Sequence, residues 1–205
     1  MVKCIQKQEE IARRILLKSG GIARTRDILL QGVYPRTLYL LREQGVIDSL
    51  ARGLNHLVEV PLPPHYELVI IAMLFPKAVI CLISALDFHD ITTQIPHAVY
   101  IAFPKGTKTP KIEYPKIRVF TYSPMDFCVG VETHELNGFK IKIFSPEKSV
   151  VDCFKFRNKI GKDVALEGLR LCFERKNSKP MQFLKYARIA KVNNIITPYL
   201  EALYE

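Results

Sequence analysis

Apolar and charged residues alternate at helical spacing near the start of the chain. Over residues 5–18, Ile5, Ile11, Ile15 and Leu16 fall on one side, with charged residues between them. This spacing predicts an amphipathic helix, and the Ser-Gly-Gly that follows predicts its end. A short extended stretch, Ile-Ala-Arg, comes next, so the first helix is expected to lead into a strand.

Two shorter helices are expected after this strand. Thr25 can cap the first of them, which should end at Gly32. Pro35 suits the first turn of the second, which should run to about Gln44. The three-residue gap between the two helices fits the tight turn of a helix-turn-helix.

A hairpin with a basic tip is predicted next. Two apolar runs, Val46–Leu50 and Leu54–Val58, flank the turn Ala-Arg-Gly that contains Arg52. Helix, strand, two helices and a hairpin is the element order of a winged helix-turn-helix. Three prolines between residues 61 and 64 then predict a stiff linker. We therefore expect a winged-helix DNA-binding domain over residues 1–60 and a second domain over residues 65–205.

The second domain begins with an apolar run, Leu68–Leu86, that approaches the length of a membrane span. Pro76 and Lys77 interrupt it, and a central lysine costs roughly 2.5–3.5 kcal/mol on insertion scales. Two buried helices are therefore favoured over a membrane span. Beyond them, β-rich runs and one Asn-Gly turn, the strongest short hairpin signal, predict a small sheet with strands at Val99–Phe103, Ile117–Tyr122, Val129–Leu136 and Phe139–Phe144.

The rest of the chain is expected to be helical. Ser145 should cap a helix that runs to about Arg157, and a second helix should cover Asp163–Phe173. Ser178 should cap a third, and the Thr-Pro pair at residues 197–198 should start the last. The predicted fold class is thus α+β: a winged helix-turn-helix followed by a mixed α/β domain with a small sheet and C-terminal helices.

Charge favours a polyanionic partner. The net charge is +10, and residues 1–62 and 151–191 carry most of the excess. The five cysteines form no Cys-x-x-Cys pair, so neither a zinc site nor a disulfide framework is expected. No cofactor is implied. Free thiols, together with the lack of an apolar signal segment before Ile11, favour the cytoplasm.

The third helix is the candidate DNA reader, because the corresponding helix of this motif enters the major groove. If Leu38 and Leu41 face the core, then Arg36, Thr37, Tyr39 and Leu40 should face outward. An arginine near the start of such a helix can bond both acceptors of a guanine. The remaining candidates would contact phosphates, a thymine methyl group or the minor groove. The full predicted DNA-binding set is Arg24, Arg26, Arg36, Thr37, Tyr39 and Arg52.

The second domain offers weaker candidates for chemistry. Lys148 and Asp152 are four apart on one helix, which allows an ion pair, and a basic cluster surrounds Gly161. Ser84 and His89 are five apart, a spacing that does not form a nucleophile–base pair, so His89 is expected to pack at a helix end. The candidate functional surface of this domain is Lys148, Asp152, Arg157, Lys159 and Lys162.

Two alternatives remain open on these residues. The second domain could be a nucleic-acid-acting enzyme, a nuclease or nucleotidyltransferase, with Asp126 and Glu132 as its carboxylates. No P-loop is present, however, and no Asp-x-Lys or Glu-x-Lys triplet lies near the hairpin. The other alternative is a winged helix that docks a protein rather than DNA.

Three segments resemble one known family. Residues 20–59, which contain the arginine-glycine of the turn, resemble the N-terminal domain of AbiEi-type antitoxins. Residues 84–106 resemble the family's Ser-Ala-Leu segment and the strand after it, and residues 141–170 resemble its most distinctive stretch. Together the three segments cover most of the chain beyond residue 20.

The resemblance implies a transcriptional regulator and antitoxin of a type IV toxin–antitoxin, abortive-infection operon. Such a protein represses its own promoter by binding repeats in double-stranded DNA, with a homodimer on the DNA as one arrangement. It opposes a nucleotidyltransferase-like toxin without forming a stable complex with it. The resemblance implies neither an enzyme nor a membrane protein.

Overall fold

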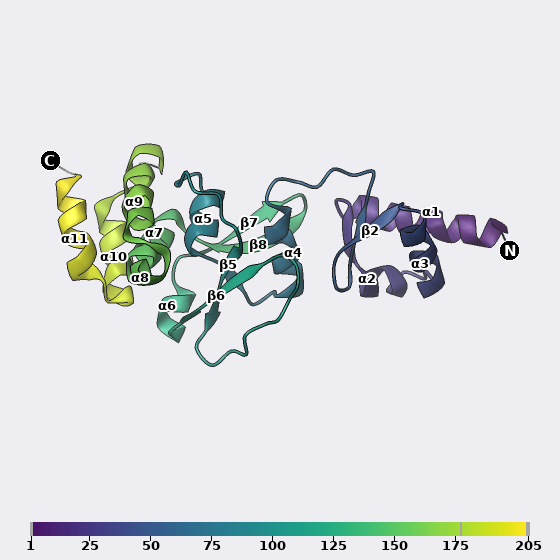
Figure 1. Ribbon diagram of the computed structural model, residues 1–205, viewed down its shortest axis with the longest axis horizontal. Coiled ribbons are helices and arrows are strands. Elements are labelled where there is room, and N and C mark those ends of the chain that lie inside the picture. Colours follow the sequence, from purple (N-terminus) through teal and green to yellow (C-terminus); the bar gives the residue numbers. More distant parts are fainter. Residues whose placement is uncertain (1, 177, 204–205) are drawn as a thin grey trace. The chain divides into compact units, whose positions relative to one another are not determined.

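The computed structural model describes residues 2–176 and 178–203 as an α+β protein with two sheets (Figure 1). The chain divides into two compact units. The first, here called the head, contains the residues up to Ile70 together with Glu135–Phe139. The second, the body, contains Ile71–His134 and the residues from Lys140 on. Each unit has its own hydrophobic core and is described by itself.

The head follows the predicted order of elements. Its three strands form an antiparallel sheet in the order β1-β3-β2, in which Ile22 pairs with His56 and Ile47 with Leu57. Helix α1 packs against α3, β1 and β3. The elements are α1 (Val2–Lys18), β1 (Ile22–Arg24), α2 (Thr25–Leu30), α3 (Pro35–Glu43), β2 (Ile47–Ala51) and β3 (Leu54–Leu57).

The amphipathic pattern of α1 and α3 explains the core of the head. Ile15 and Leu16 of α1 and Leu38 and Leu41 of α3 are all buried there, as their spacing predicts. The expected cap at Thr25 is wrong. Arg24 occupies the N-cap position of α2 without a side-chain cap, and the Thr25 hydroxyl instead accepts a hydrogen bond from another part of the head.

The second sheet is mixed and has five strands in the order β6-β5-β4-β8-β7, which belong to the body except at the β7–β8 turn, where Glu135–Phe139 are counted with the head. Strand β4 pairs antiparallel with β5 and parallel with β8, while β5 and β6 are parallel in the register Val99↔Ile117. The short strand β4 was not expected from the sequence, because it lies inside the apolar run read as two helices. The strands are β4 (Val79–Ile80), β5 (Val99–Pro104), β6 (Ile117–Tyr122), β7 (Val131–Leu136) and β8 (Phe139–Phe144).

The Asn-Gly hairpin is confirmed. Asn137 and Gly138 join β7 to β8, and both have positive φ values, 48° and 83°. Positive φ at both central residues is the requirement of a type I′ turn, which asparagine and glycine meet at low cost. The dipeptide therefore sets the pairing of these two strands.

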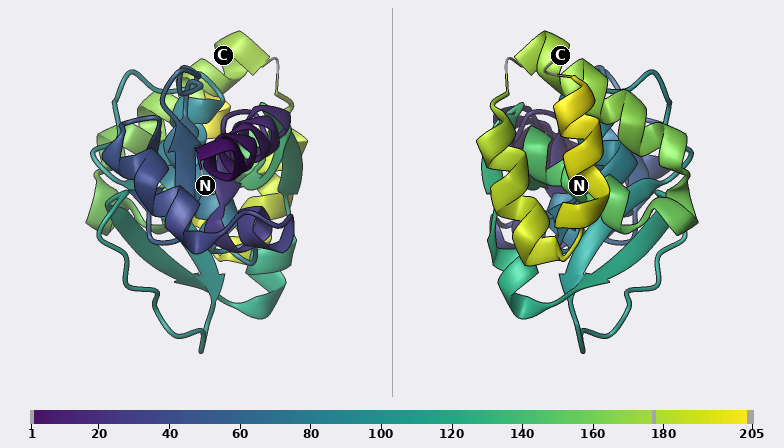
Figure 2. Two further views of the ribbon diagram at one scale, coloured as in Figure 1. Left: turned by 90° about the vertical axis from the view of Figure 1, so that its right-hand side faces the viewer. Right: turned by 90° about the vertical axis from the view of Figure 1, so that its left-hand side faces the viewer.

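Eight helices in the described part of the chain begin beyond β3. Helix α7 is central among them, because it packs against α5, α9, α10 and α11. Figures 1 and 2 show α10 and α11 side by side. The helices are α4 (Tyr66–Leu74), α5 (Leu82–Phe88), α6 (Pro124–Cys128), α7 (Pro146–Lys155), α8 (Arg157–Ile160), α9 (Lys162–Lys176), α10 (Pro180–Ala190) and α11 (Asn193–Ala202).

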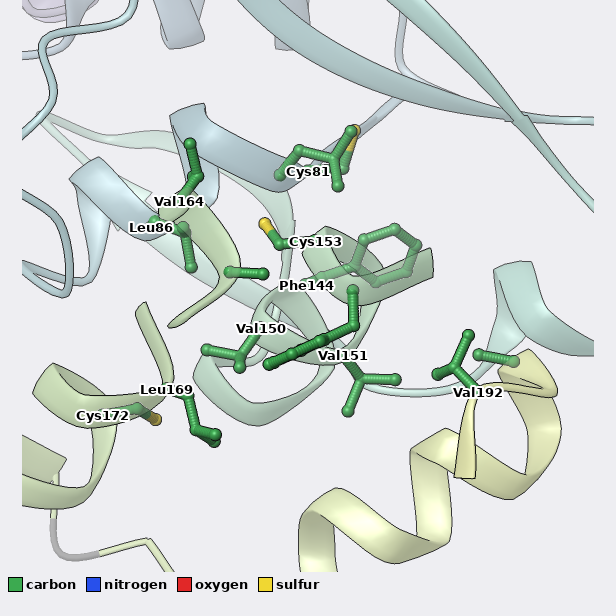
Figure 3. Close-up of a cluster of buried hydrophobic side chains, with 14 of the residues drawn as sticks. Cys81, Leu86, Phe144, Val150, Val151, Cys153, Val164, Leu169, Cys172 and Val192 are labelled. Atoms are coloured by element: carbon green, nitrogen blue, oxygen red, sulfur yellow. The ribbon is translucent and has the colours of Figure 1, made fainter. Parts of the chain in front are cut away.

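The core of the body forms around α7. Val150, Val151 and Cys153 of this helix are fully buried with Phe144 at the end of β8 (Figure 3). The run from Lys148 to Phe154 is buried on every side of the helix. A helix that is buried all round has no wet face, so the usual rule that its charged positions face water does not hold here.

Two predicted helix starts in the body are wrong. Lys179, not Ser178, occupies the N-cap position of α10, and the Ser178 hydroxyl donates to Glu147 instead. Helix α11 begins at Asn193 and contains Pro198 in its interior, where the neighbouring Thr197 hydroxyl donates to the Asn193 carbonyl. Among the described residues, no helix is long and apolar enough to cross a membrane.

Candidate nucleic-acid interface

Helix α3 presents a polar and aromatic face to solvent. Arg36 is exposed, and Tyr39 is 61% exposed although its ring is largely apolar. Thr37, by contrast, is only 6% exposed, so the expectation that it faces outward is wrong. Thr37 directly precedes Leu38 and lies four residues before Leu41, so it shares the side of the helix that packs into the core.

The other cations of the predicted set come from two further elements. Arg26 is exposed in the first turn of α2, and Arg24 is half-buried just before it. Arg52 is exposed in the turn between β2 and β3, where Gly53 supplies a φ of 78°. Thr25 donates its backbone N–H to the Gly53 carbonyl at 2.8 Å, so the hairpin turn and the start of α2 lie together.

A buried amide connects these elements, and sequence reading missed it. Asn55 of β3 is completely buried. Its side-chain oxygen accepts a hydrogen bond from Arg42 at 2.6 Å, and its nitrogen donates to the Thr25 hydroxyl at 2.9 Å. One side chain thereby joins the last turn of α3 to the first residue of α2. The only sequence signal was a polar residue at an inward position of a short apolar strand.

Tyr34 was also missed. It lies at the N-cap of α3 and is 61% exposed, as Tyr39 is. Its backbone N–H donates to the side chain of Gln8 on α1 at 3.1 Å, which holds the turn between α2 and α3 in place. Exposed aromatic rings on both sides of Arg36 give this end of α3 an apolar as well as a cationic character.

The charges on the head differ in how they are compensated. Arg13 of α1 pairs with Glu59 at 2.7 Å and with Glu9 at 3.5 Å. Among the described residues, no ion pair involves Arg26, Arg36 or Arg52. Cations without an internal partner keep their charge available for an external anion.

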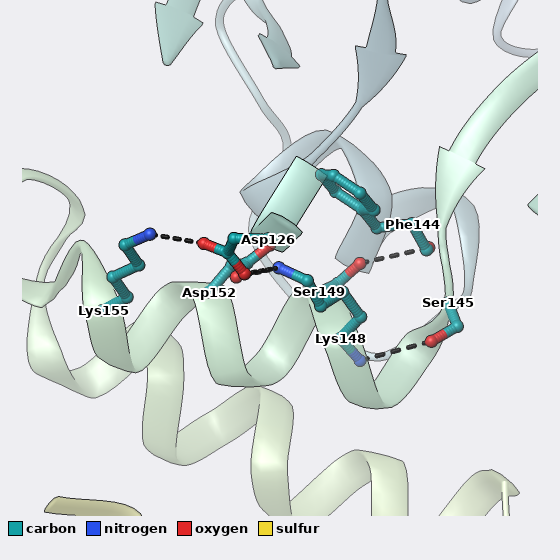
Figure 4. Close-up of polar contacts among 7 residues, drawn as sticks. All are labelled: Asp126, Phe144, Ser145, Lys148, Ser149, Asp152 and Lys155. Carbon is teal, nitrogen blue, oxygen red and sulfur yellow. Dashed lines mark hydrogen bonds and ion pairs between the residues drawn. The ribbon is translucent and has the colours of Figure 1, made fainter. Parts of the chain in front are cut away.

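Lys148 and Asp152 form the predicted ion pair, but the expectation that they belong to a functional surface is wrong. Both side chains are 0% exposed. Lys148 Nζ lies 2.5 Å from Asp152 Oδ1 and 3.0 Å from Asp126 Oδ1, and Lys155 Nζ lies 2.5 Å from Asp126 Oδ2 (Figure 4). Two lysines and two aspartates therefore form one cluster with balanced charge, in which Lys148, Asp126 and Asp152 are buried and the Lys155 side chain is 26% exposed.

Aromatic rings and burial set the electrostatics of this cluster. Lys148 Nζ lies 4.7 Å from the ring centre of Phe144 and 5.0 Å from that of Tyr122. Burial raises the pKa of Asp152 to about 6, although Lys148 opposes the change. Burial also acts to raise the pKa of Asp126, but Lys148 and Lys155 together lower it below its usual value.

The basic cluster around Gly161 remains at the surface. Lys159 and Lys162 are exposed and Arg157 is half-buried. Arg157 donates to the Phe154 carbonyl at 2.9 Å, and Lys162 Nζ lies 5.2 Å from the ring centre of Tyr199. These three residues therefore stay candidates for anion contact, without Lys148 and Asp152.

The residues considered for catalysis have structural partners. His89 lies at the end of α5, as expected, and its ring bonds the Phe144 carbonyl at 2.8 Å. Glu132 pairs with His134 at 2.9 Å, whereas Asp126 is buried with its two lysines. The described residues contain no group of three His, Cys, Asp or Glu side chains placed to hold a metal ion.

Comparison with known proteins connects the head to one family. No curated protein matches the chain. A solved structure, that of the RV2827C protein from Mycobacterium tuberculosis, matches the fold with a TM-score of 0.56 at 13% sequence identity. The match covers 88% of this chain and 76% of that one. Residues 10–54, from α1 into β3, match the model of the family described as "Transcriptional regulator, AbiEi antitoxin". The resemblance to the AbiEi family that the sequence indicates is thus confirmed for the head of this chain.

Proposed function

We propose that this protein is a DNA-binding transcriptional regulator whose head is a winged helix-turn-helix. The family match over residues 10–54 supports regulation in general. The order of elements in the head supports the specific motif, with α2 and α3 as the helix pair and the β2–β3 hairpin as the wing.

The observation that carries the proposal is the exposed end of α3. Arg36 and Tyr39 face solvent there, while the opposite side of the helix is packed into the core and its last turn is bonded to Asn55. A rigid helix that presents an arginine beside aromatic rings is suited to enter the major groove. There the guanidinium can bond both acceptors of a guanine and a ring can contact a thymine methyl group.

The remaining cations of the head would position the protein on the DNA backbone. We assign Arg24 and Arg26 to phosphates near the start of α2, and Arg52 to the backbone or minor groove beside the wing. Thr37 is left out of the contacting set because its side chain is buried.

The resemblance to AbiEi antitoxins extends the proposal. We propose that the protein binds repeats in its own promoter as double-stranded DNA, in a homodimeric arrangement, and represses its operon. In the same scheme the body opposes a nucleotidyltransferase-like toxin without a stable complex. Cys81, Cys128 and Cys153 are thiols in the structure, which supports a reducing, cytoplasmic location.

The test is a gel-shift titration of the protein against the DNA upstream of its own gene, at two salt concentrations, with scrambled DNA as competitor. We expect specific binding whose affinity falls steeply with salt, because phosphate contacts release counterions. Arg36→Ala should weaken specific binding by about 1–3 kcal/mol, or roughly 5- to 150-fold. Arg14→Ala removes the same charge from an exposed position on α1 and is the matched control.

Each outcome separates this proposal from its rivals. If Arg36→Ala and Arg14→Ala weaken binding equally, Arg36 contributes only charge and is not a base reader. Equal affinity for upstream and scrambled DNA would contradict self-regulation through that site. Salt-insensitive binding to a protein would favour a docking role for the head.

A further inference from the structure

The body contains a cavity that the proposed function does not use. It lies between the α5–β5 loop, residues 92–98, and the edge strand β6, and its volume is about 540 Å³. Pockets of about 300–1,000 Å³ are the usual size for small-molecule sites. Its walls are mainly apolar, formed by Ile83, Ile95, Pro96, Ala98 and Tyr100, with Thr93, Gln94, His97 and Arg118 as polar lining.

The loop that forms one wall is held at both ends. At its start, Glu167 of α9 accepts hydrogen bonds from the Thr92 hydroxyl at 3.0 Å and from the Thr93 hydroxyl and backbone at 2.5 and 3.1 Å. Burial acts to raise the pKa of Glu167, but these bonds lower it below its usual value, so the carboxylate is ionised and engaged. At the loop's end, the buried Ser84 hydroxyl accepts from Tyr100 N at 3.0 Å and donates to Ala98 O at 3.4 Å. The cavity is therefore preformed.

Arg118 gives the lining of the cavity a positive charge, and it forms no ion pair among the described residues. Arg118 donates to the Tyr100 hydroxyl at 2.8 Å, and its guanidinium carbon lies 5.1 Å from the centre of that ring. This contact orients the guanidinium but leaves most of its donors unused, since an arginine has five. None of the nine lining residues is acidic, and His97 adds a second group that can donate a hydrogen bond.

We propose that this cavity binds a small organic phosphate monoester, such as a mononucleotide. The phosphate oxygens would meet Arg118 and His97, because a guanidinium held in one orientation suits bidentate contact with a phosphate. The organic part would lie on the apolar wall. Ile95 is 82% exposed at this wall, and a ligand that covered it would remove apolar surface from water.

Calorimetric titration of the full-length protein tests the proposal with three probes. Adenosine monophosphate combines the phosphate with an organic part, inorganic phosphate supplies the anion alone, and adenosine supplies the organic part alone. We expect saturable binding of the monophosphate, at least tenfold tighter than that of either part. Absence of saturable binding by all three at millimolar concentration would overturn the proposal. So would equal binding of adenosine and its monophosphate.

Three variants locate the site. Arg118→Met keeps the length of the side chain but removes its charge, and should weaken monophosphate binding at least tenfold. Ile95→Glu places a carboxylate at an exposed position of the rim, so the variant is expected to fold normally. The carboxylate should repel the phosphate and weaken monophosphate binding at least tenfold, as Arg118→Met should. Lys116→Gln removes an exposed cation two residues from Arg118 that does not line the cavity, and should change the affinity less than twofold.

The pattern across these variants decides the outcome. Circular dichroism checks that each variant is folded. If Ile95→Glu folds and binds the monophosphate as the unaltered protein does, the ligand lies elsewhere and the assignment of this cavity is wrong. If Lys116→Gln weakens binding as much as Arg118→Met, the phosphate responds to general surface charge rather than to a built site.

Discussion

Replacing Lys148 by methionine should destabilise the body strongly. Lys148 is completely buried and lies within 3.0 Å of both Asp126 and Asp152. After the replacement Asp126 would keep Lys155, at 2.5 Å, but Asp152 would lose the only cation within ion-pair distance of it among the described residues. Breaking a buried pair by removing one partner typically costs about 3–5 kcal/mol, because it leaves an uncompensated buried charge. We expect a loss of this size.

Urea denaturation followed by circular dichroism measures this loss. The matched comparison is Lys148→Met combined with Asp152→Leu, which removes both charges and fills a similar volume. Replacing a whole buried pair by apolar residues is often close to neutral, so the double variant should recover most of the lost stability. A loss below about 1 kcal/mol for Lys148→Met alone, or no recovery in the double variant, would refute the argument that the cluster is held together by charge balance.

Three further predictions follow from the geometry. Burial raises the pKa of Asp152 from 3.8 to about 6, so the folded state binds the proton of this carboxyl group more tightly than the unfolded state does. Protonation of Asp152 therefore stabilises the fold. This contribution is fully present below pH 3.8 and is lost as the pH rises through 6. Urea titrations from pH 4 to 7 should show this fall, and Asp152→Asn should flatten it. Gly130→Ala should cost about 2–4 kcal/mol, because φ is +68° and the new Cβ would lie 2.8 Å from Lys148 Cβ. Gly106→Ala, with φ +90° and open space, isolates the backbone strain and should cost about 1–2 kcal/mol in the same assay. Asn55→Ala should lower the free energy of unfolding by about 1–3 kcal/mol, because it removes a buried hydrogen-bonded amide. In gel shifts it should also reduce the ratio of the affinity for specific DNA to that for scrambled DNA. An unchanged ratio would mean that the amide does not position α3.

Local signals in the sequence predicted the elements that depend on local chemistry. The amphipathic spacing of α1 and α3, the Asn-Gly turn and the Ser145 cap of α7 were all read correctly. Strand β4 was missed because two residues inside an apolar run carry no period of their own. Whether such a run forms a strand depends on partners far away in the chain, here β5 and β8.

The errors at Thr25 and Ser178 have a common cause. Both residues have hydroxyl groups that could cap a helix, and both lie next to a helix start. In the structure each hydroxyl bonds a side chain distant in sequence, Asn55 in one case and Glu147 in the other. A capping residue is predicted from its neighbours alone, whereas its hydroxyl can be taken by any partner that the fold brings near.

The same reasoning explains why exposure was predicted better for the candidate residues on α3 than for those on α7. On α3 the helical period separates a buried side from a wet side, so exposure could be predicted for Arg36 and Tyr39, and only Thr37, at the border, was misplaced. On α7 the same period predicts a solvent-facing side at Lys148 and Asp152, but the fold buries that side too. A buried charge is costly unless it is paired with an opposite one, and Asp126 and Lys155 complete a neutral cluster with Lys148 and Asp152. Charges that the fold neutralises in this way are not available to an external ligand, whereas cations that form no ion pair among the described residues, such as Arg36, keep their charge for an external anion.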